Sequence, residues 1–283
     1  MDYRDRVVVV TGASSGIGRQ VALDFAARGA ALVISARRGD LLAATARECE
    51  ARGGRVEAMT GDVAERTFIA EMVARAVRRF GRLDVVVNNA GISKHKQAYH
   101  LTPDEVEYVM RVNFLAPAIL TLAALPQMLR QGEGWVVNVS SAAGKIAPPR
   151  EAVYAASKFA LNGLTEGLWL DLAGSNVHVA VINVGPIDTE IWEKTDEPTA
   201  YRGRKYPPTV ISRAVFRAIE QRKHELWVPR TMQLVWLFRV LFPGLYRFGA
   251  ARWDPVPPEV IAAARERAAT RPAQGPESSK SAK

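Results

Sequence analysis

Near its amino terminus the chain reads Arg6-Val7-Val8-Val9-Val10-Thr11-Gly12-Ala13-Ser14-Ser15-Gly16-Ile17-Gly18, and this segment is the most informative about the fold. Its valines predict a buried parallel strand, because such strands are covered on both faces. Its glycines allow a tight turn, and a helical pattern follows. This order predicts a phosphate-binding turn, since the N-terminus of a helix offers free N–H groups to an anion. A simple strand-to-helix turn is the alternative that the motif leaves open.

The alternation of strand and helix continues along the chain. Further strand-like runs are residues 30–35, 56–60, 83–87, 135–139, 177–182 and 225–228. Strands that alternate with helices predict an α/β fold with a doubly wound parallel sheet. We therefore expect one Rossmann-type domain over residues 1–230, with a seven-stranded, mostly parallel sheet flanked by helices. Ligands of such sheets bind at the carboxyl ends of the strands.

Two arginines follow the second strand. NAD is usually bound there by a carboxylate on its ribose, whereas arginine accommodates the 2′-phosphate of NADP. Arg37 and Arg38 occupy this position, and Ser14 of the glycine turn can add a hydrogen bond to the phosphate. We expect an NADP phosphate site, with loop charges as the alternative interpretation.

Polar and small residues also follow later strands. Asp62 comes after the third strand, where a carboxylate can accept a hydrogen bond from an adenine amino group. The sequence Asn89-Ala90-Gly91 follows the fourth strand and suits the wall of a site for a flat ligand. Ser140 and Ser141 end the fifth strand and place two hydroxyls at the same edge.

Tyr154 and Lys158 lie four residues apart in a segment, 151–171, that is predicted to be helical. Residues at this spacing share one helix face. A neighbouring ammonium favours phenolate and lowers the pKa of a phenol, which suits proton transfer. A packed tyrosine beside a solvated lysine is the alternative, and an isolated pattern of this kind favours it.

Asn113 lies in an apolar part of the helical stretch that Thr102 begins. A buried amide needs hydrogen-bond partners. Two interpretations stay open: an amide bonded to backbone in the core, or an amide that holds a chain of water molecules.

Composition excludes several classes of protein. The chain has 283 residues, 48% apolar and 24% charged, which is typical of a soluble globular protein. Its one cysteine, Cys49, cannot form an internal disulfide and favours a reducing, cytoplasmic setting. We expect no signal peptide and no membrane-spanning helix. The net charge is +9, but the sequence contains no nucleic-acid-binding motif, so we expect no nucleic-acid partner. The four histidines do not have the spacing of metal ligands.

The carboxyl-terminal part is the most individual. Residues 227–253 are rich in large apolar side chains and arginine, so an amphipathic membrane-surface contact through 231–253 is one interpretation. An oligomer contact or a flap over the site is the other. We assign 231–269 as a helical extension, 190–208 as a mobile lid and 270–283 as a disordered tail. The apolar content favours a bulky apolar substrate.

These residues together resemble the short-chain dehydrogenase/reductase family over residues 5 to about 230. The motifs that carry the resemblance stand in family order: Thr11-Gly12-x-x-x-Gly16-x-Gly18, Asn89-Ala90-Gly91, Asn113, Ser141, Tyr154 and Lys158. One departure is Val184-Gly185-Pro186, where the family usually has proline before the glycine.

The resemblance implies a role for each matching residue. Tyr154 is the general acid in carbonyl reduction and the base in alcohol oxidation, and Lys158 lowers its pKa and holds the nicotinamide ribose. Ser141, rather than Ser140, bonds the substrate oxygen, and Asn113 anchors a proton-relaying water. The implied cofactor-binding residues are Gly12, Ser14, Ser15, Gly16, Ile17, Gly18, Arg37, Arg38, Asp62, Val63, Asn89, Ala90, Gly91, Tyr154, Lys158, Ile187 and Thr189.

The function implied is an NADP(H)-dependent oxidoreductase that acts on a secondary alcohol or ketone, with a steroid-, retinoid- or fatty-acyl-like substrate. An NAD-preferring dehydrogenase and a non-catalytic NADP-sensing protein on the same fold are the alternatives. The resemblance also implies a homodimer or homotetramer formed through the helices that carry Asn113 and Tyr154. We expect a cytoplasmic protein and leave membrane association open.

Overall fold

A computed structural model describes residues 1–192, 201, 203–253, 261–263 and 265–266. Within these ranges seven strands form one sheet in the order β3-β2-β1-β4-β5-β6-β7, and every neighbouring pair is parallel. The predicted α/β class is confirmed, and the sheet is parallel throughout rather than mostly so. The strands are β1 (Val7–Thr11), β2 (Ala31–Ala36), β3 (Arg55–Thr60), β4 (Val85–Asn88), β5 (Gly134–Val139), β6 (Val177–Val184) and β7 (Glu225–Val228).

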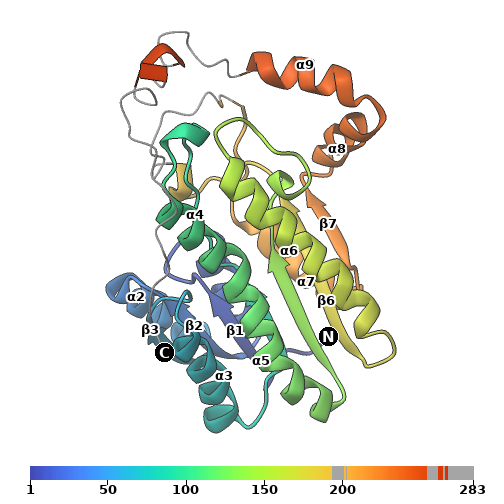
Figure 1. Ribbon diagram of the computed structural model, residues 1–283. Helices are drawn as coiled ribbons and strands as arrows, with labels where there is room; N and C mark the ends of the chain where they lie inside the picture. Colours follow the sequence, from blue (N-terminus) through green and yellow to red (C-terminus); the bar gives the residue numbers. More distant parts are fainter. Residues whose placement is uncertain (193–200, 202, 254–260, 264, 267–283) are drawn as a thin grey trace, which may run out of the picture.

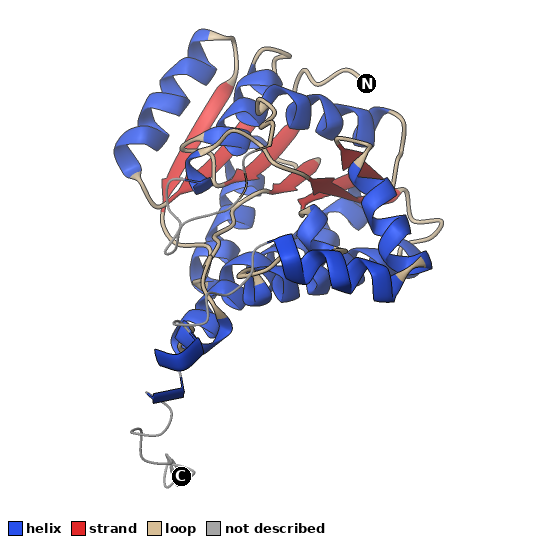
Figure 2. Ribbon diagram, turned by 90° about the horizontal axis from the view of Figure 1, so that it is seen from above, coloured by secondary structure: helices blue, strands red, loops and turns tan. Residues whose placement is uncertain are grey.

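Helices cover both faces of the sheet, as the view along it shows (Figure 2). On one face α1 (Gly16–Ala26), α2 (Gly39–Ala51) and α7 (Thr209–Glu220) close one buried apolar cluster. On the other face α3 (Arg66–Phe80), α5 (Ala116–Gln131) and α6 (Ala152–Asp171) close a second. The side chains of β1 alternate between the two clusters, Val8 and Val10 in the first and Val7 and Val9 in the second. This explains why the strand needs four valines in a row.

The helix before β5 is long and changes its winding partway. It consists of α4 (Pro103–Met110), a π-helical segment (Arg111–Leu115) and α5. Thr102 caps it as predicted: its hydroxyl accepts from the Glu105 backbone N–H at 3.2 Å, and the Glu105 carboxylate accepts from the Thr102 N–H at 3.1 Å. The π-helical segment carries Asn113, and such segments often mark functional sites.

This helix bears on the expectation that the chain has no membrane-spanning helix. Its 29 residues include a window of mean hydropathy 1.6, so one segment does have the length and composition of a membrane span. The helix nevertheless packs against the sheet, where Leu120, Ala124 and Met128 are fully buried. The apolar side chains on its inner side belong to the core of the domain.

Two further helices extend from the end of β7 and stand apart from the sheet in Figure 1, above the carboxyl ends of its strands. We call α8 (Met232–Leu241) and α9 (Pro243–Trp253) the carboxyl-terminal arm. Its inner side contacts the rest of the domain. The ring centres of Trp236 and Trp227 are 6.1 Å apart, and the Arg239 guanidinium carbon lies 5.9 Å from the centre of the Phe159 ring. Most of the predicted 231–269 extension beyond residue 253, the 270–283 tail and the centre of the predicted 190–208 lid lie outside the described residues.

Candidate active site

The turn between β1 and α1 packs tightly against the end of β4. Thr11 Oγ1 accepts from the backbone N–H groups of Asn89 and Ala90, both at 3.0 Å. A Cβ atom at Gly18 would lie 2.3 Å from the Gly12 carbonyl oxygen and 2.4 Å from Asn89 Nδ2. A Cβ at Gly12, where φ is +69°, would lie 2.9 Å from Ala90 Cα. Only glycine fits these two places, so the turn leaves its backbone open to a close ligand.

The N-terminus of α1 suits an anion. Ser15 precedes the helix without a side-chain cap bond, and the first turn holds no acidic residue. Gly16 begins α1 at φ +55°, and a Cβ there would lie 3.0 Å from Thr189 Cγ2. The loop after β6 therefore faces the glycine turn. Ile187 of that loop is 4% exposed and belongs to the apolar cluster beneath α1, and Ile17 packs against the same cluster. Free N–H groups and the positive end of the helix dipole point into this space.

Arg38 reaches back to the glycine turn. Its guanidinium donates to Ser15 Oγ at 2.7 Å and to Ser14 Oγ at 3.3 Å, and it pairs with Glu190 at 2.7 Å. Glu190 begins a short 3₁₀ turn, Glu190–Trp192, after β6. A positive charge thus lies beside two hydroxyls at the place where the sequence predicts a 2′-phosphate, and a carboxylate from the chain after β6 pairs with it.

Arg37 belongs to a second network at the ends of β2 and β3. Its guanidinium donates to Tyr108 Oη at 2.6 Å, and Tyr108 donates to Asp62 Oδ2 at 2.7 Å. Asp62 Oδ1 also accepts from the Ala64 backbone N–H at 2.9 Å, while Val63 is buried in the core cluster. Sequence reasoning missed Tyr108, because only the packing of α4 over these strand ends brings it there.

Tyr154, Lys158 and Ser141 meet where β5 ends. Lys158 is 4% exposed, and its ammonium donates to the Val139 carbonyl oxygen at 3.0 Å and lies 5.8 Å from the centre of the Tyr154 ring. Ser141 caps the 3₁₀ turn Ala142–Gly144, accepting from the Ala143 N–H at 3.1 Å, and its hydroxyl also interacts with the Tyr154 phenol. Ser141 rather than Ser140 approaches the phenol, as the family spacing implies; the Ser140 hydroxyl lies 3.5 Å from the Lys158 carbonyl.

The electrostatics of this pair differ from the expectation. Burial raises the pKa of Tyr154 to about 12, against the lowering effect of the hydrogen bond from Ser141. Burial also lowers the pKa of Lys158 to about 8. The net pKa of Tyr154 is therefore raised rather than lowered here, and the lowering effect of Lys158 stays a prediction. The physical reason is that desolvation outweighs the nearby cation, whose ammonium bonds the end of β5 rather than the phenol oxygen.

Asn113 is fully buried and bonds the loop after β4. Its Oδ1 accepts from the Ile92 N–H at 2.9 Å, and its Nδ2 donates to the Ile92 carbonyl at 2.8 Å and to Ser157 Oγ at 3.0 Å. A Cβ at Gly91 would lie 3.5 Å from Asn113 Oδ1 and 3.6 Å from Lys158 Nζ, so the three groups adjoin. Of the two interpretations, the side-chain contacts match the amide bonded to backbone, and it ties the β4 loop to α6.

Comparison with known proteins decides the family. The model of the short chain dehydrogenase family matches residues 6–200. This protein belongs to the short-chain dehydrogenase family. A bovine dehydrogenase/reductase SDR family member 7B is 34% identical over 261 residues, which cover 86% of this chain and 79% of that protein. Members of this family are oxidoreductases, and the chain is an enzyme of that class.

Solved structures of short-chain dehydrogenases share the fold and differ in cofactor. One from Burkholderia phymatum in complex with NAD superposes with a TM-score of 0.80, is 26% identical and covers 91% of this chain and 99% of its own. A metagenomic short-chain oxidoreductase in complex with NADP has a TM-score of 0.67 and 32% identity, covering 77% of this chain and 91% of its own. A nicotinamide dinucleotide is therefore the cofactor class of the family.

This short-chain dehydrogenase also has a polar cluster beside Tyr154 that sequence reasoning missed. Ser93 donates to Glu151 Oε2 at 2.8 Å, and His95 Nδ1 lies 2.9 Å from Glu151 Oε1. The cluster joins the loop after β4 to the start of α6, and the negative charge of Glu151 contributes to the raised pKa of Tyr154. Nothing in the spacing of His95 and Glu151, 56 positions apart, signals their contact.

Proposed function

We propose that this protein is an NADP(H)-dependent oxidoreductase that interconverts a secondary alcohol and a ketone. The observation that carries the proposal is the arrangement at the carboxyl edge of the sheet. The phenol of Tyr154 and the hydroxyl of Ser141 adjoin there, next to a glycine turn with no room for a Cβ. An oxygen atom that bonds both hydroxyls would be within reach of proton transfer.

The side chains divide the work of that reaction. In ketone reduction Ser141 donates a hydrogen bond to the substrate oxygen, and Tyr154 gives its proton to the same oxygen as negative charge develops. In alcohol oxidation the phenolate takes the proton back. The bound dinucleotide supplies or accepts the hydride. A pKa of about 12 keeps Tyr154 protonated at neutral pH, which supports the role of proton donor.

The preference for NADP rests on the end of β2. Arg37 and Arg38 occupy the place of the acidic residue that NAD enzymes use, and Arg38 already bonds the hydroxyls of Ser14 and Ser15. A guanidinium suits phosphate because it donates in a planar, two-pronged geometry. Glu190 would then neutralise part of the charge on Arg38 when no phosphate is bound.

The cofactor test compares kcat/KM for NADPH and NADH in the wild type, Arg37→Ala and Arg38→Ala. Arg52→Ala, an exposed arginine beyond α2, serves as a matched control. A hydrogen bond to a charged group contributes about 1.5–3 kcal/mol, so each site variant should lose about 10- to 100-fold for NADPH and little for NADH. Wild-type preference for NADH, with both variants unchanged, would support the NAD-preferring alternative.

The test of catalysis is Tyr154→Phe. We expect turnover to fall by about 10²- to 10⁴-fold, the usual contribution of a general acid, while NADPH affinity measured by nucleotide fluorescence stays near that of the wild type. Equal turnover in the two proteins would contradict the assignment. NADPH binding without turnover of any ketone by the wild type would favour the non-catalytic, NADP-sensing alternative.

We propose a bulky apolar substrate, such as a steroid, retinoid or fatty-acyl derivative. The support is the position of the carboxyl-terminal arm beside the reaction site. A Cβ at Gly185, in the loop after β6, would lie 3.4 Å from Met232 Cγ, and Arg239 stands over Phe159, the residue after Lys158. A panel of ketones of increasing apolar size, assayed with NADPH, tests the proposal; equal rates with sugars would count against it.

We propose a homodimer formed by α5 and α6, with a homotetramer as the larger assembly. Leu115, Leu122 and Leu129 repeat at seven-residue spacing on the outer side of the π-helical segment and α5, exposed by 38, 59 and 47%. Leu170 of α6 is 77% exposed. An apolar stripe of this kind is typical of an interface between helices.

We propose that the enzyme works in the cytoplasm, with the segment 231–253 available for peripheral membrane contact. The support for the first part is the single cysteine of the chain, Cys49, which is buried in α2. Fractionation of cells that express the tagged full-length protein tests both parts.

A further inference from the structure

A pocket of about 270 Å³ lies between α7 and β7, on the face of the sheet opposite α6. Arg213 and Arg217 contribute from neighbouring turns of α7, and Arg230 contributes from the chain after β7. The remaining lining side chains are apolar, among them Trp227 and Pro229, and no acidic residue lines the pocket. Three positive charges therefore surround one cavity without a counter-charge in its wall.

What distinguishes these three arginines is that they line one cavity with no carboxylate among the described residues of its wall. Arg6, Arg19 and Arg75, like several other arginines, pair with carboxylates. Arg213, Arg217 and Arg230 form no ion pair inside the described ranges, and Arg217 Nε is buried there without a hydrogen-bond partner. Like charges held together repel one another, and a buried donor without an acceptor is costly. An anion in the pocket would remove both penalties, because guanidinium groups bind phosphate in charge-assisted pairs.

The surface next to the pocket is apolar and also basic. Arg230 leads directly into the carboxyl-terminal arm, and residues 226–253 contain four arginines and no acidic residue. The outer side of the arm exposes large side chains: Leu234 by 65%, Leu241 by 67%, Leu245 by 60% and Phe248 by 57%. Apolar side chains beside arginines are what a helix needs to lie in the interface of an anionic membrane.

We infer that the pocket binds the phosphate of an anionic phospholipid headgroup while the arm lies in the membrane interface. The charge of the chain favours this occupant over a second copy of the same protein. An isologous contact would bring the same arginine-rich surface against itself, in a chain of net charge +9, whereas an anionic lipid surface attracts it. The inference rests on the α7–β7 pocket and is independent of the oxidoreductase activity.

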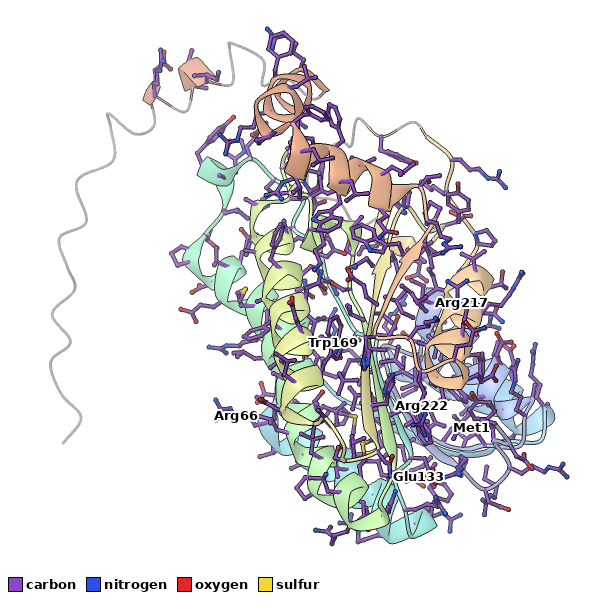
Figure 3. The ribbon with its side chains drawn as sticks, turned by 90° about the vertical axis from the view of Figure 1, so that its right-hand side faces the viewer. Met1, Arg66, Glu133, Trp169, Arg217 and Arg222 are labelled. Atoms are coloured by element: carbon purple, nitrogen blue, oxygen red, sulfur yellow. The ribbon has the colours of Figure 1, made fainter. Side chains whose placement is uncertain are left out.

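The experiment measures co-sedimentation of the full-length protein with vesicles of phosphatidylcholine alone or mixed with phosphatidic acid. The test variant is Arg213→Gln with Arg217→Gln. The control, Arg66→Gln with Arg79→Gln, removes the same charge from α3; Figure 3 shows Arg66 and Arg217 at opposite sides of the molecule. We expect binding only to the anionic vesicles, about tenfold or more weaker in the test variant and unchanged in the control. Leu241→Gln with Phe248→Gln should also weaken it.

Two further measurements separate the possible sources of the anion. Inorganic phosphate should compete with vesicle binding of the wild type and raise its thermal midpoint more than that of the test variant. Equal vesicle binding by the test variant and the wild type would overturn the headgroup site. Phosphate binding without any vesicle binding would overturn the membrane assignment, as would self-association on ultracentrifugation that the test variant abolishes. Retained NADPH binding shows that each variant is folded.

Discussion

Replacement of Asn113 by alanine offers the sharpest test of how the site is held together. The amide is fully buried in the π-helical segment and makes three hydrogen bonds, two to the backbone of Ile92 and one to Ser157. Alanine removes all three and leaves the Ile92 N–H and carbonyl without these partners. Because Ile92 follows Gly91, which adjoins Lys158, the loop should loosen where the nicotinamide is expected.

The magnitude follows from those contacts. Three lost hydrogen bonds at about 1 kcal/mol each, with about 1 kcal/mol more for the orphaned groups of Ile92, give a total of about 4 kcal/mol. For a domain of this size that lowers the thermal midpoint by roughly 8–16 °C. Urea unfolding followed by circular dichroism measures the free energy, and an unchanged slope with urea would show that the unfolded state is unaffected.

Ser157→Ala provides a graded comparison. It removes one of the three partners of Asn113 and leaves both bonds to Ile92, so we expect a loss of about 1 kcal/mol. A loss below about 1 kcal/mol for Asn113→Ala itself would refute the reasoning, because the amide would then not secure the loop. Full turnover in Asn113→Ala would likewise show that the position of the loop does not matter to catalysis.

Three other changes test separate parts of the structure. Gly18→Ala should abolish NADPH binding, because its Cβ would lie 2.3 Å from a backbone oxygen, whereas Gly163→Ala, with no atom within 4 Å, should bind normally in the same titration. The pKa of Glu105 is lowered to about 2, chiefly by its hydrogen bond with Lys96. Its contribution to the free energy of unfolding is therefore present above its ordinary pKa of 4.5 and is lost as the pH falls towards 2. In Glu105→Gln the free energy of unfolding should depend less on pH between 4.5 and 2. If the proposed dimer forms through α5 and α6, Leu122→Arg should give a monomer in light scattering, and an unchanged mass would exclude this face as the interface.

Much of the fold could be predicted because its signals are local. Four valines in a row require cover on both sides, and β1 has it. The glycines of the turn leave room for close contacts with the Gly12 carbonyl and with Asn89, which follows the neighbouring strand β4. The capping box at Thr102 depends on three neighbouring positions alone. Periodicity, turns and caps depend on short segments of the chain, so they can be predicted from the sequence alone.

The tertiary structure decided which side chains meet and what their surroundings do to them. Arg38 and Glu190 are 152 positions apart, and His95 and Glu151 are 56 apart, so only the packing of strand ends and loops joins them. The spacing of Tyr154 and Lys158 predicted that they share a helix face, but the depth of burial determined that the pKa of the phenol rises. Distance along the chain sets local geometry, whereas desolvation and long-range contacts depend on every element that packs around a group.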